Sequence, residues 1–195
     1  RVTVPPMPRT RTFDLPTPHA TVTTAARIGS ALQPGDTLLL EGGIGAGKTH
    51  FARALIQSLQ DEPEDVPSPS FTLVQEYDTR AGPLWHADLY RLTGPDDIAE
   101  LGLEEAFETA ICLVEWPDRL GPLRPGTALT LAFAPGTTDS AREVQLRWTA
   151  PRCTRSRRSW SIGSAVREGL AARASAVTQQ QPGSGGRGRP STSRC

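Results

Sequence analysis

The eight residues from Gly42 to Thr49 have the composition and spacing of a phosphate-binding loop. They read GGIGAGKT and match the pattern GxxxxGK(S/T), in which glycines allow a tight turn that points backbone N–H groups at phosphate oxygens. Lys48, the only lysine of the chain, would bridge the β- and γ-phosphates of a nucleotide, and the hydroxyl of Thr49 would bind Mg²⁺. The rest of the loop would supply the other phosphate contacts, from Gly43, Ile44, Gly45, Ala46 and Gly47.

A site of this kind needs a second carboxylate near the metal, and the sequence offers Glu115. This glutamate ends a short apolar run, Ile111–Val114, whose length is typical of a buried strand. Trp116 follows it and would either lie beside the nucleotide or cover the core. A solvated glutamate at a strand end is the alternative for Glu115, and the residues themselves leave both alternatives open.

The segments on both sides of the loop predict an α/β domain. The apolar run Thr37–Glu41 is expected to form a strand before the loop, and Lys48–Gln60 an amphipathic helix after it. A helix over His19–Leu32 precedes them, and the acidic segment 96–108 predicts a further helix with an interruption at Gly102. The remaining strands are expected at 71–77 and 84–89, which would form a hairpin, and at 110–114, 128–134 and 143–148.

The composition changes along the chain, and it divides the 195 residues into three parts. Residues 1–12 are rich in proline and are expected to be a disordered extension, followed by the nucleotide-binding domain at 13–150. Residues 151–195 hold nine arginines and one acidic residue, with too few apolar side chains for a core, so we expect a disordered basic tail. An RNA-contacting tail is the alternative interpretation of this segment.

The composition also disfavours several classes of protein. No apolar run approaches the roughly 18 residues that cross a bilayer, and three scattered cysteines indicate a reducing, cytoplasmic compartment. A guanine-binding NKxD element would need a second lysine, which excludes ordinary GTPases. A small-molecule kinase stays open, because it needs only this loop, an acid and an acceptor site, and so does a nucleotide-sensing module that does not hydrolyse.

Three further segments follow the loop in a fixed order: VPSPSFTLV at 66–74, HADLYRL at 86–92 and LVEWP at 113–117. Together with GIGAGKT they resemble the TsaE (YjeE) family, the ATPase component of bacterial tRNA threonylcarbamoyladenosine biosynthesis. The resemblance covers about residues 13–150 and is far more specific than the loop alone.

The resemblance implies a single P-loop NTPase-like domain with a mixed β-sheet flanked by helices, which binds ATP and Mg²⁺. It also implies that the protein works with TsaD and TsaB and meets tRNA only through that complex. Its slow ATP hydrolysis would support turnover of the TsaB–TsaD machinery, without transfer of the threonylcarbamoyl group by the protein itself.

The resemblance also assigns roles to individual residues. Lys48 and Thr49 match the family's phosphate and magnesium positions, and Glu115 matches its metal-associated carboxylate. Asp88 would be a further acid in ATP turnover, either orienting water or acting on the metal through water. Thr72 falls in a switch-like SPxFT segment, where it would act in catalysis. The residue close to the nucleotide would be Trp116.

Asp88 could instead cap a helix or pair with Arg91, and for His86, which shares its strand face, we expect a packing role. The sequence departs from the family pattern at three positions, Gly43, His50 and Ser70, none of which removes a phosphate or metal ligand.

Overall fold

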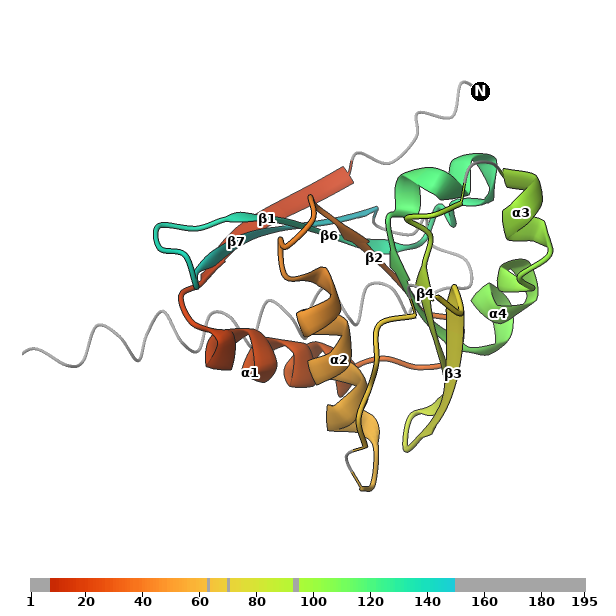
Figure 1. Ribbon diagram of the computed structural model, residues 1–195, viewed down its shortest axis with the longest axis horizontal. Coiled ribbons are helices and arrows are strands. Elements are labelled where there is room, and N and C mark those ends of the chain that lie inside the picture. The colour runs from red at the N-terminus through yellow and green to blue at the C-terminus, as the bar shows by residue number, and fades with distance from the viewer. Residues whose placement is uncertain (1–7, 63, 70, 93–94, 150–195) are drawn as a thin grey trace, which may run out of the picture.

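Parallel strands form the centre of the sheet in this computed structural model, which describes residues 8–62, 64–69, 71–92 and 95–149. Antiparallel strands continue the sheet on both sides, so the seven-stranded sheet is mixed, as predicted (Figure 1). The spatial order is β1 (Pro8–Leu15), β7 (Arg142–Thr149), β6 (Leu129–Pro135), β2 (Thr37–Glu41), β5 (Ile111–Glu115), β4 (Gly82–Asp88) and β3 (Val74–Thr79), of which β6, β2, β5 and β4 are the parallel ones.

Helices cover the two faces of this sheet. Helices α1 (Pro18–Gly29) and α2 (Lys48–Leu59) pack against each other and against one face (Figure 1). The other face, around β5 and β4, is covered by α3 (Pro95–Ala99), α4 (Leu103–Thr109) and the 3₁₀ helix η1 (Pro117–Leu123). Apolar side chains therefore form one core on each side of the sheet.

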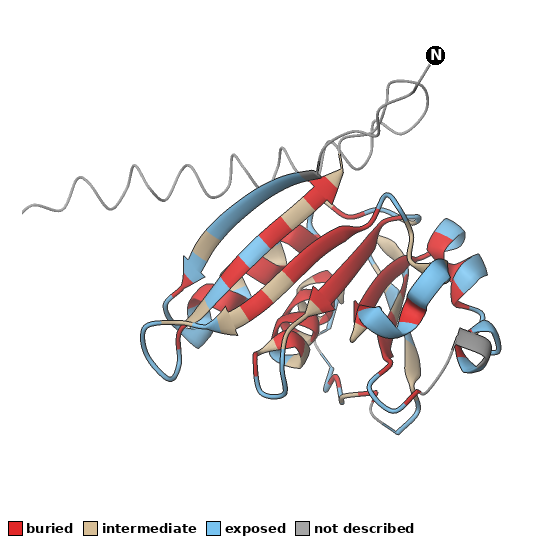
Figure 2. Cartoon of the chain, turned by 90° about the horizontal axis from the view of Figure 1, so that it is seen from above, coloured by how far each residue is buried: buried red, intermediate tan, exposed pale blue. Residues whose placement is uncertain are grey.

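Strand β2 shows why the sequence folds in this way. Leu38 and Leu40 enter the core beneath α1 and α2, and Leu39 enters the opposite core. A parallel strand that is covered on both faces is apolar along its whole length, instead of alternating. Figure 2 shows the buried central strands beside an exposed edge strand.

The prediction of disorder for residues 1–12 is wrong for residues 8–12. These residues form most of strand β1, which pairs with β7 from Pro8 opposite Thr149 to Leu15 opposite Arg142. The pairing partner lies far away in the chain, so local composition could not reveal it. Residues 1–7 and the predicted tail at 151–195 lie outside the described residues, and the expectations for them stay predictions.

The predicted interruption at Gly102 is confirmed, and it divides the acidic segment into α3 and α4. Gly102 has a φ of +71°, a left-handed conformation that glycine adopts without steric cost, and it stands directly before α4. The sequence did not predict the short helix η1. Within the described ranges the structure contains no helix that is long and apolar enough to span a bilayer.

Candidate functional site

The glycine loop links the end of β2 to the start of α2, where the sequence placed it. Gly42 begins the loop with a φ of +140°, and a Cβ atom on it would lie 2.7 Å from the carbonyl oxygen of Phe133. Only glycine fits so close to the backbone of β6. The loop therefore passes close to the neighbouring strand and leads directly into the N-terminus of α2.

Side chains on the face of the sheet that does not carry α1 and α2 anchor the end of β2, just before the loop. Glu41, the last residue of β2, pairs with Arg124 at 2.8 Å and also with Arg147. Arg124 in addition donates a hydrogen bond to Thr130 at 3.1 Å. The base of the loop is thus linked to the chain after η1 and to β7.

Lys48 is buried, with 4% of its surface exposed, and its amino group folds back on the loop. Its Nζ donates hydrogen bonds to the carbonyl oxygens of Gly42 at 2.8 Å and Gly43 at 2.9 Å. The same nitrogen lies 4.1 Å from the ring centroid of Trp116, a cation–π distance. Burial lowers the pKa of Lys48, while the negative charges of Glu115 and Asp88 oppose that shift.

The two predicted acids lie side by side at the ends of neighbouring parallel strands. Asp88 ends β4 and Glu115 ends β5, and the strand register pairs them directly. Both are buried, at 6% and 1% exposed surface. The hydroxyl of Thr49 donates a hydrogen bond to Oε2 of Glu115 at 2.9 Å. The structure thus brings together the threonine and the glutamate that the sequence assigned to magnesium.

A buried histidine joins this group, although the sequence suggested only packing for it. Nε2 of His86 lies 3.0 Å from Oε1 of Glu115, and both side chains are almost inaccessible. The alternation of side chains along β4 places His86 on the same face as Asp88, and this spacing was the one available signal. No pattern in the sequence links His86 to Glu115, which is 29 residues away.

Asp88 is connected to the segment that contains Thr72. Oδ1 of Asp88 accepts a hydrogen bond from the backbone N–H of Tyr90 at 3.1 Å, and the N–H of Asp88 donates to the carbonyl of Leu73 at 2.9 Å. Leu73 has a φ of +63°, which is strained for a leucine. Thr72 itself is exposed, so it does not join the buried group around Lys48.

Trp116 lies between Lys48 and the core around β5 and β4, so both of its sequence interpretations stay open. Its backbone has a φ of +59°, again left-handed, where β5 gives way to η1. Its ring is in contact with the ring of Tyr90, with 4.9 Å between the centroids, and it faces Lys48. The aromatic pair therefore connects the ends of β4 and β5 above the lysine.

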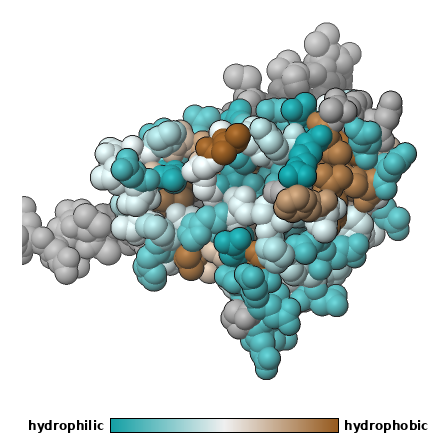
Figure 3. Space-filling view, viewed as in Figure 1, coloured by the Kyte–Doolittle hydropathy of each residue, from teal (hydrophilic) through white to brown (hydrophobic). Residues whose placement is uncertain are grey.

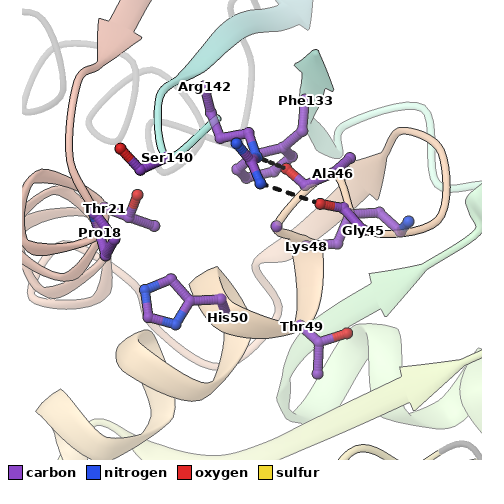
Figure 4. Close-up of a pocket in the computed structure, with 11 residues that line it drawn as sticks. Pro18, Thr21, Gly45, Ala46, Lys48, Thr49, His50, Phe133, Ser140 and Arg142 are labelled. Atoms are coloured by element: carbon purple, nitrogen blue, oxygen red, sulfur yellow. Dashed lines mark hydrogen bonds between the residues drawn. The ribbon is translucent and has the colours of Figure 1, made fainter. Parts of the chain in front are cut away.

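A pocket of about 440 Å³ lies on the other side of the loop, between α1, α2 and the β6–β7 hairpin (Figure 4). Arg142 forms one wall, and its guanidinium donates to the carbonyl oxygens of Ala46 at 2.9 Å and Gly45 at 3.3 Å. In Figure 4 His50 points toward α1, and Thr49 points away from it. Arg142 was not predicted from the sequence, because it is 96 residues from Ala46.

The oxygen atoms of Thr49, Glu115 and Asp88 fit a magnesium ion that arrives with a nucleotide. Magnesium prefers hard oxygen ligands, and it is commonly held by one or two carboxylates together with phosphates and water. Within the described residues no group of three or more His, Cys, Asp and Glu side chains could hold a metal by itself. The residues thus suit a metal that phosphate helps to bind.

This geometry places the protein among the P-loop nucleotide-binding proteins, because the loop, its lysine and the neighbouring acids meet at one edge of a parallel sheet. The model of the family described as "Threonylcarbamoyl adenosine biosynthesis protein TsaE" matches residues 15–144. The chain belongs to the TsaE family, which confirms the resemblance found in its motifs.

Individual relatives agree with the family match. The tRNA threonylcarbamoyladenosine biosynthesis protein TsaE of Rickettsia felis is 43% identical over 94 residues, which cover 48% of this chain and 55% of the relative. The protein of the same name from Bacillus subtilis is 41% identical over 128 residues, covering 65% of this chain and 78% of the relative. The chain thus spans about half the length of the Rickettsia felis relative.

A crystal structure of Bacillus subtilis YdiB has the same fold. It superposes with a TM-score of 0.64 at 27% sequence identity, and the match covers 84% of this chain and 98% of that one. The predicted α/β class is therefore confirmed by comparison with a solved structure as well as by the strand order.

Two of the three departures from the family pattern can be placed in the structure. Gly43 is exposed, and a Cβ atom added to it would meet nothing within 4 Å. His50 lines the pocket beside α1 and is exposed. Gly43 contacts Lys48 only through its backbone carbonyl, which any residue would supply, and His50 lines the same pocket as Lys48. The third departure, Ser70, lies outside the described residues.

Proposed function

We propose that the protein binds ATP with Mg²⁺ and hydrolyses it slowly, as a cytoplasmic ATPase of tRNA threonylcarbamoyladenosine modification. The proposal includes TsaB and TsaD as partners, with tRNA reached through their complex. The observation that carries it is the meeting of Lys48, Thr49, Asp88 and Glu115 at one edge of the sheet. Phosphoryl transfer requires mainly such positioning of charges around the phosphates.

In this proposal each residue has a separate task. The backbone from Gly43 to Gly47 surrounds the phosphates, and Lys48 leaves the carbonyl groups of the loop to bind them. Thr49 and Glu115 would hold Mg²⁺, which would supply positive charge beside the phosphate oxygens. Asp88 orients water for attack on the γ-phosphate.

The proposal includes the role in catalysis that the resemblance implies for Thr72, which lies on the surface. The carbonyl of Leu73 accepts a hydrogen bond from the N–H of Asp88, so this segment is connected to the catalytic acid. A change in its conformation on nucleotide or partner binding would be transmitted to Asp88. Hydrolysis would stay slow until a partner orders the segment and fixes the attacking water.

Exposed apolar side chains support the dependence on a partner. Phe71 is 86% exposed, Ile44 is 80% exposed at the tip of the loop, and Tyr90 is 48% exposed beside Trp116. Figure 3, which has the same view as Figure 1, also shows hydrophobic surface gathered near α3 and β4. Such surface is typical of regions that contact other proteins.

Phosphate release tests the proposal directly. Wild-type protein is incubated with γ-labelled ATP and Mg²⁺, alone and then with TsaB, TsaD and tRNA, beside the variants Lys48→Ala and Arg11→Ala. We expect free phosphate from wild type and from Arg11→Ala, more of it with the partners, and none from Lys48→Ala. Label on a small-molecule acceptor would indicate a kinase instead. Nucleotide binding with no hydrolysis, even in the complete mixture, would indicate a sensing module.

A further inference from the structure

The proposed function does not use the buried histidine on β4, and its surroundings point to a role. His86 has no exposed surface, and its Nε2 lies 3.0 Å from Oε1 of Glu115. Its other ring nitrogen, Nδ1, is also buried and has no hydrogen-bond partner among the residues that the structure describes. The polar contact of the imidazole is therefore directed at one carboxylate oxygen.

These contacts indicate which ring nitrogen carries hydrogen. An ionised carboxylate only accepts hydrogen bonds, so the hydrogen between His86 and Glu115 belongs to Nε2. A second hydrogen on Nδ1 would be a buried donor without an acceptor, and such donors are rarer in proteins than unused lone pairs. The neutral ring with hydrogen on Nε2 fits the observed surroundings.

We propose that His86 is a positioning residue that fixes the carboxylate of Glu115 for Mg²⁺. His86 occupies Oε1, while Thr49 donates to Oε2 at 2.9 Å. With one partner on each oxygen the carboxylate plane cannot rotate freely, and Oε2 is kept on the side of the threonine that would share the metal. Partners that hydrogen-bond to metal ligands orient those ligands in this way.

This inference rests on the proposed function, since the role of Glu115 toward magnesium is part of that proposal. Positioning differs from packing in that it requires a hydrogen-bond donor at Nε2 of His86. A side chain of similar bulk without an N–H would fill the same space but would leave Oε1 without a donor. A side chain that keeps an N–H at a similar reach would hold the carboxylate.

Two substitutions use this difference. His86→Leu keeps apolar bulk and removes the donor, and His86→Gln retains an N–H near the position of Nε2. Cys112→Ala is the control, because it shortens a buried side chain of β5 that lies in the opposite core. The measurement is the binding of fluorescent ADP at rising Mg²⁺ concentration, and again in EDTA without the metal.

We expect His86→Leu to raise the Mg²⁺ concentration at half-saturation by about tenfold or more, as is typical for the loss of such a partner. His86→Gln and Cys112→Ala stay within about threefold of wild type, and all variants bind ADP equally in EDTA. Equal Mg²⁺ dependence in His86→Leu and wild type would overturn the proposal. An equal loss in the leucine and glutamine variants would overturn it too, because packing alone would then explain both.

A measurement on the wild-type protein covers the case in which a variant does not fold. The ¹⁵N shifts of the His86 ring should show hydrogen on Nε2 and none on Nδ1, and the reverse pattern would overturn the proposal. If wild type binds no nucleotide at all, the proposed function fails, whereas a Mg²⁺-dependent wild type with an unaffected His86→Leu refutes only the role of His86.

Discussion

Replacement of Arg142 by alanine should weaken nucleotide binding although the residue is outside the glycine loop. Arg142 begins β7, and it donates to Ala46 and Gly45 in the loop and to Asp139 and Ala141 in its own hairpin. It therefore fastens the loop to the C-terminal hairpin. Without Arg142, the loop would become ordered only when the phosphates bind. The conformational entropy lost in that ordering would reduce the affinity for the nucleotide.

The expected size follows from the two bonds to the loop. A hydrogen bond with a charged donor contributes about 1.5–3 kcal/mol, and we take a value well below that range for the longer, exposed bond to Gly45. The loss is then about 2 kcal/mol, which corresponds to roughly 30-fold weaker binding at about 1.4 kcal/mol per tenfold. Arg142→Lys, which keeps the charge but has one nitrogen, should lose less.

Calorimetric titration with ADP and with pyrophosphate measures this effect. Because the arginine acts through the loop, pyrophosphate, which has no base, should lose affinity by the same factor as ADP. Arg11→Ala, which removes an exposed arginine of the edge strand, should bind both ligands like wild type. Binding by Arg142→Ala within about twofold of wild type, with a folded protein, would refute the reasoning, as would an equal loss in Arg11→Ala.

Three further predictions concern single side chains. Gly42→Ala should abolish nucleotide binding, because its Cβ would lie 2.7 Å from the carbonyl oxygen of Phe133. Calorimetry that still detects the heat of nucleotide binding to this variant would contradict the prediction. Trp116→Phe should bind ADP within about threefold of wild type but lose the change in tryptophan fluorescence caused by departure of Lys48 from the indole ring. Burial raises the pKa of the Cys112 thiol from 9.0 to about 12, so the unfolded chain loses this proton first and stability falls as pH rises above 9. Urea unfolding measures the free energy of unfolding of wild type and of Cys112→Ala. The difference between the two should fall by up to about 1.4 kcal/mol per pH unit between pH 9 and 11. A difference that stays constant over this range would contradict the raised pKa.

The parts of the site that could be predicted from sequence are those with a local signal. The loop has its glycines, lysine and threonine within eight residues, and the apolar runs on either side indicate strand and helix. Glu115 follows a short apolar run, and Asp88 was indicated by the resemblance of its segment to the TsaE family. Parallel strands then bring the two acids to one edge of the sheet.

The parts that could not be predicted depend on contacts between distant segments. Strand β1 is stabilised by pairing with β7, and its own composition of proline, arginine and threonine is that of a loop. Arg142 and His86 act on residues 96 and 29 positions away, where no spacing pattern exists. The same holds for Glu41, whose arginine partners are 83 and 106 residues away.

The pairing of β1 with β7 has a consequence for synthesis of the protein on the ribosome. The first strand of the described domain must wait for its partner, because β7 ends at Thr149, after nearly every other element has been made. Arg142, which secures the glycine loop, emerges in that same late strand. A nascent chain that already contains the loop, its lysine and both acids thus still lacks the arginine that braces the loop, so we expect nucleotide to assist folding most once β7 has been made.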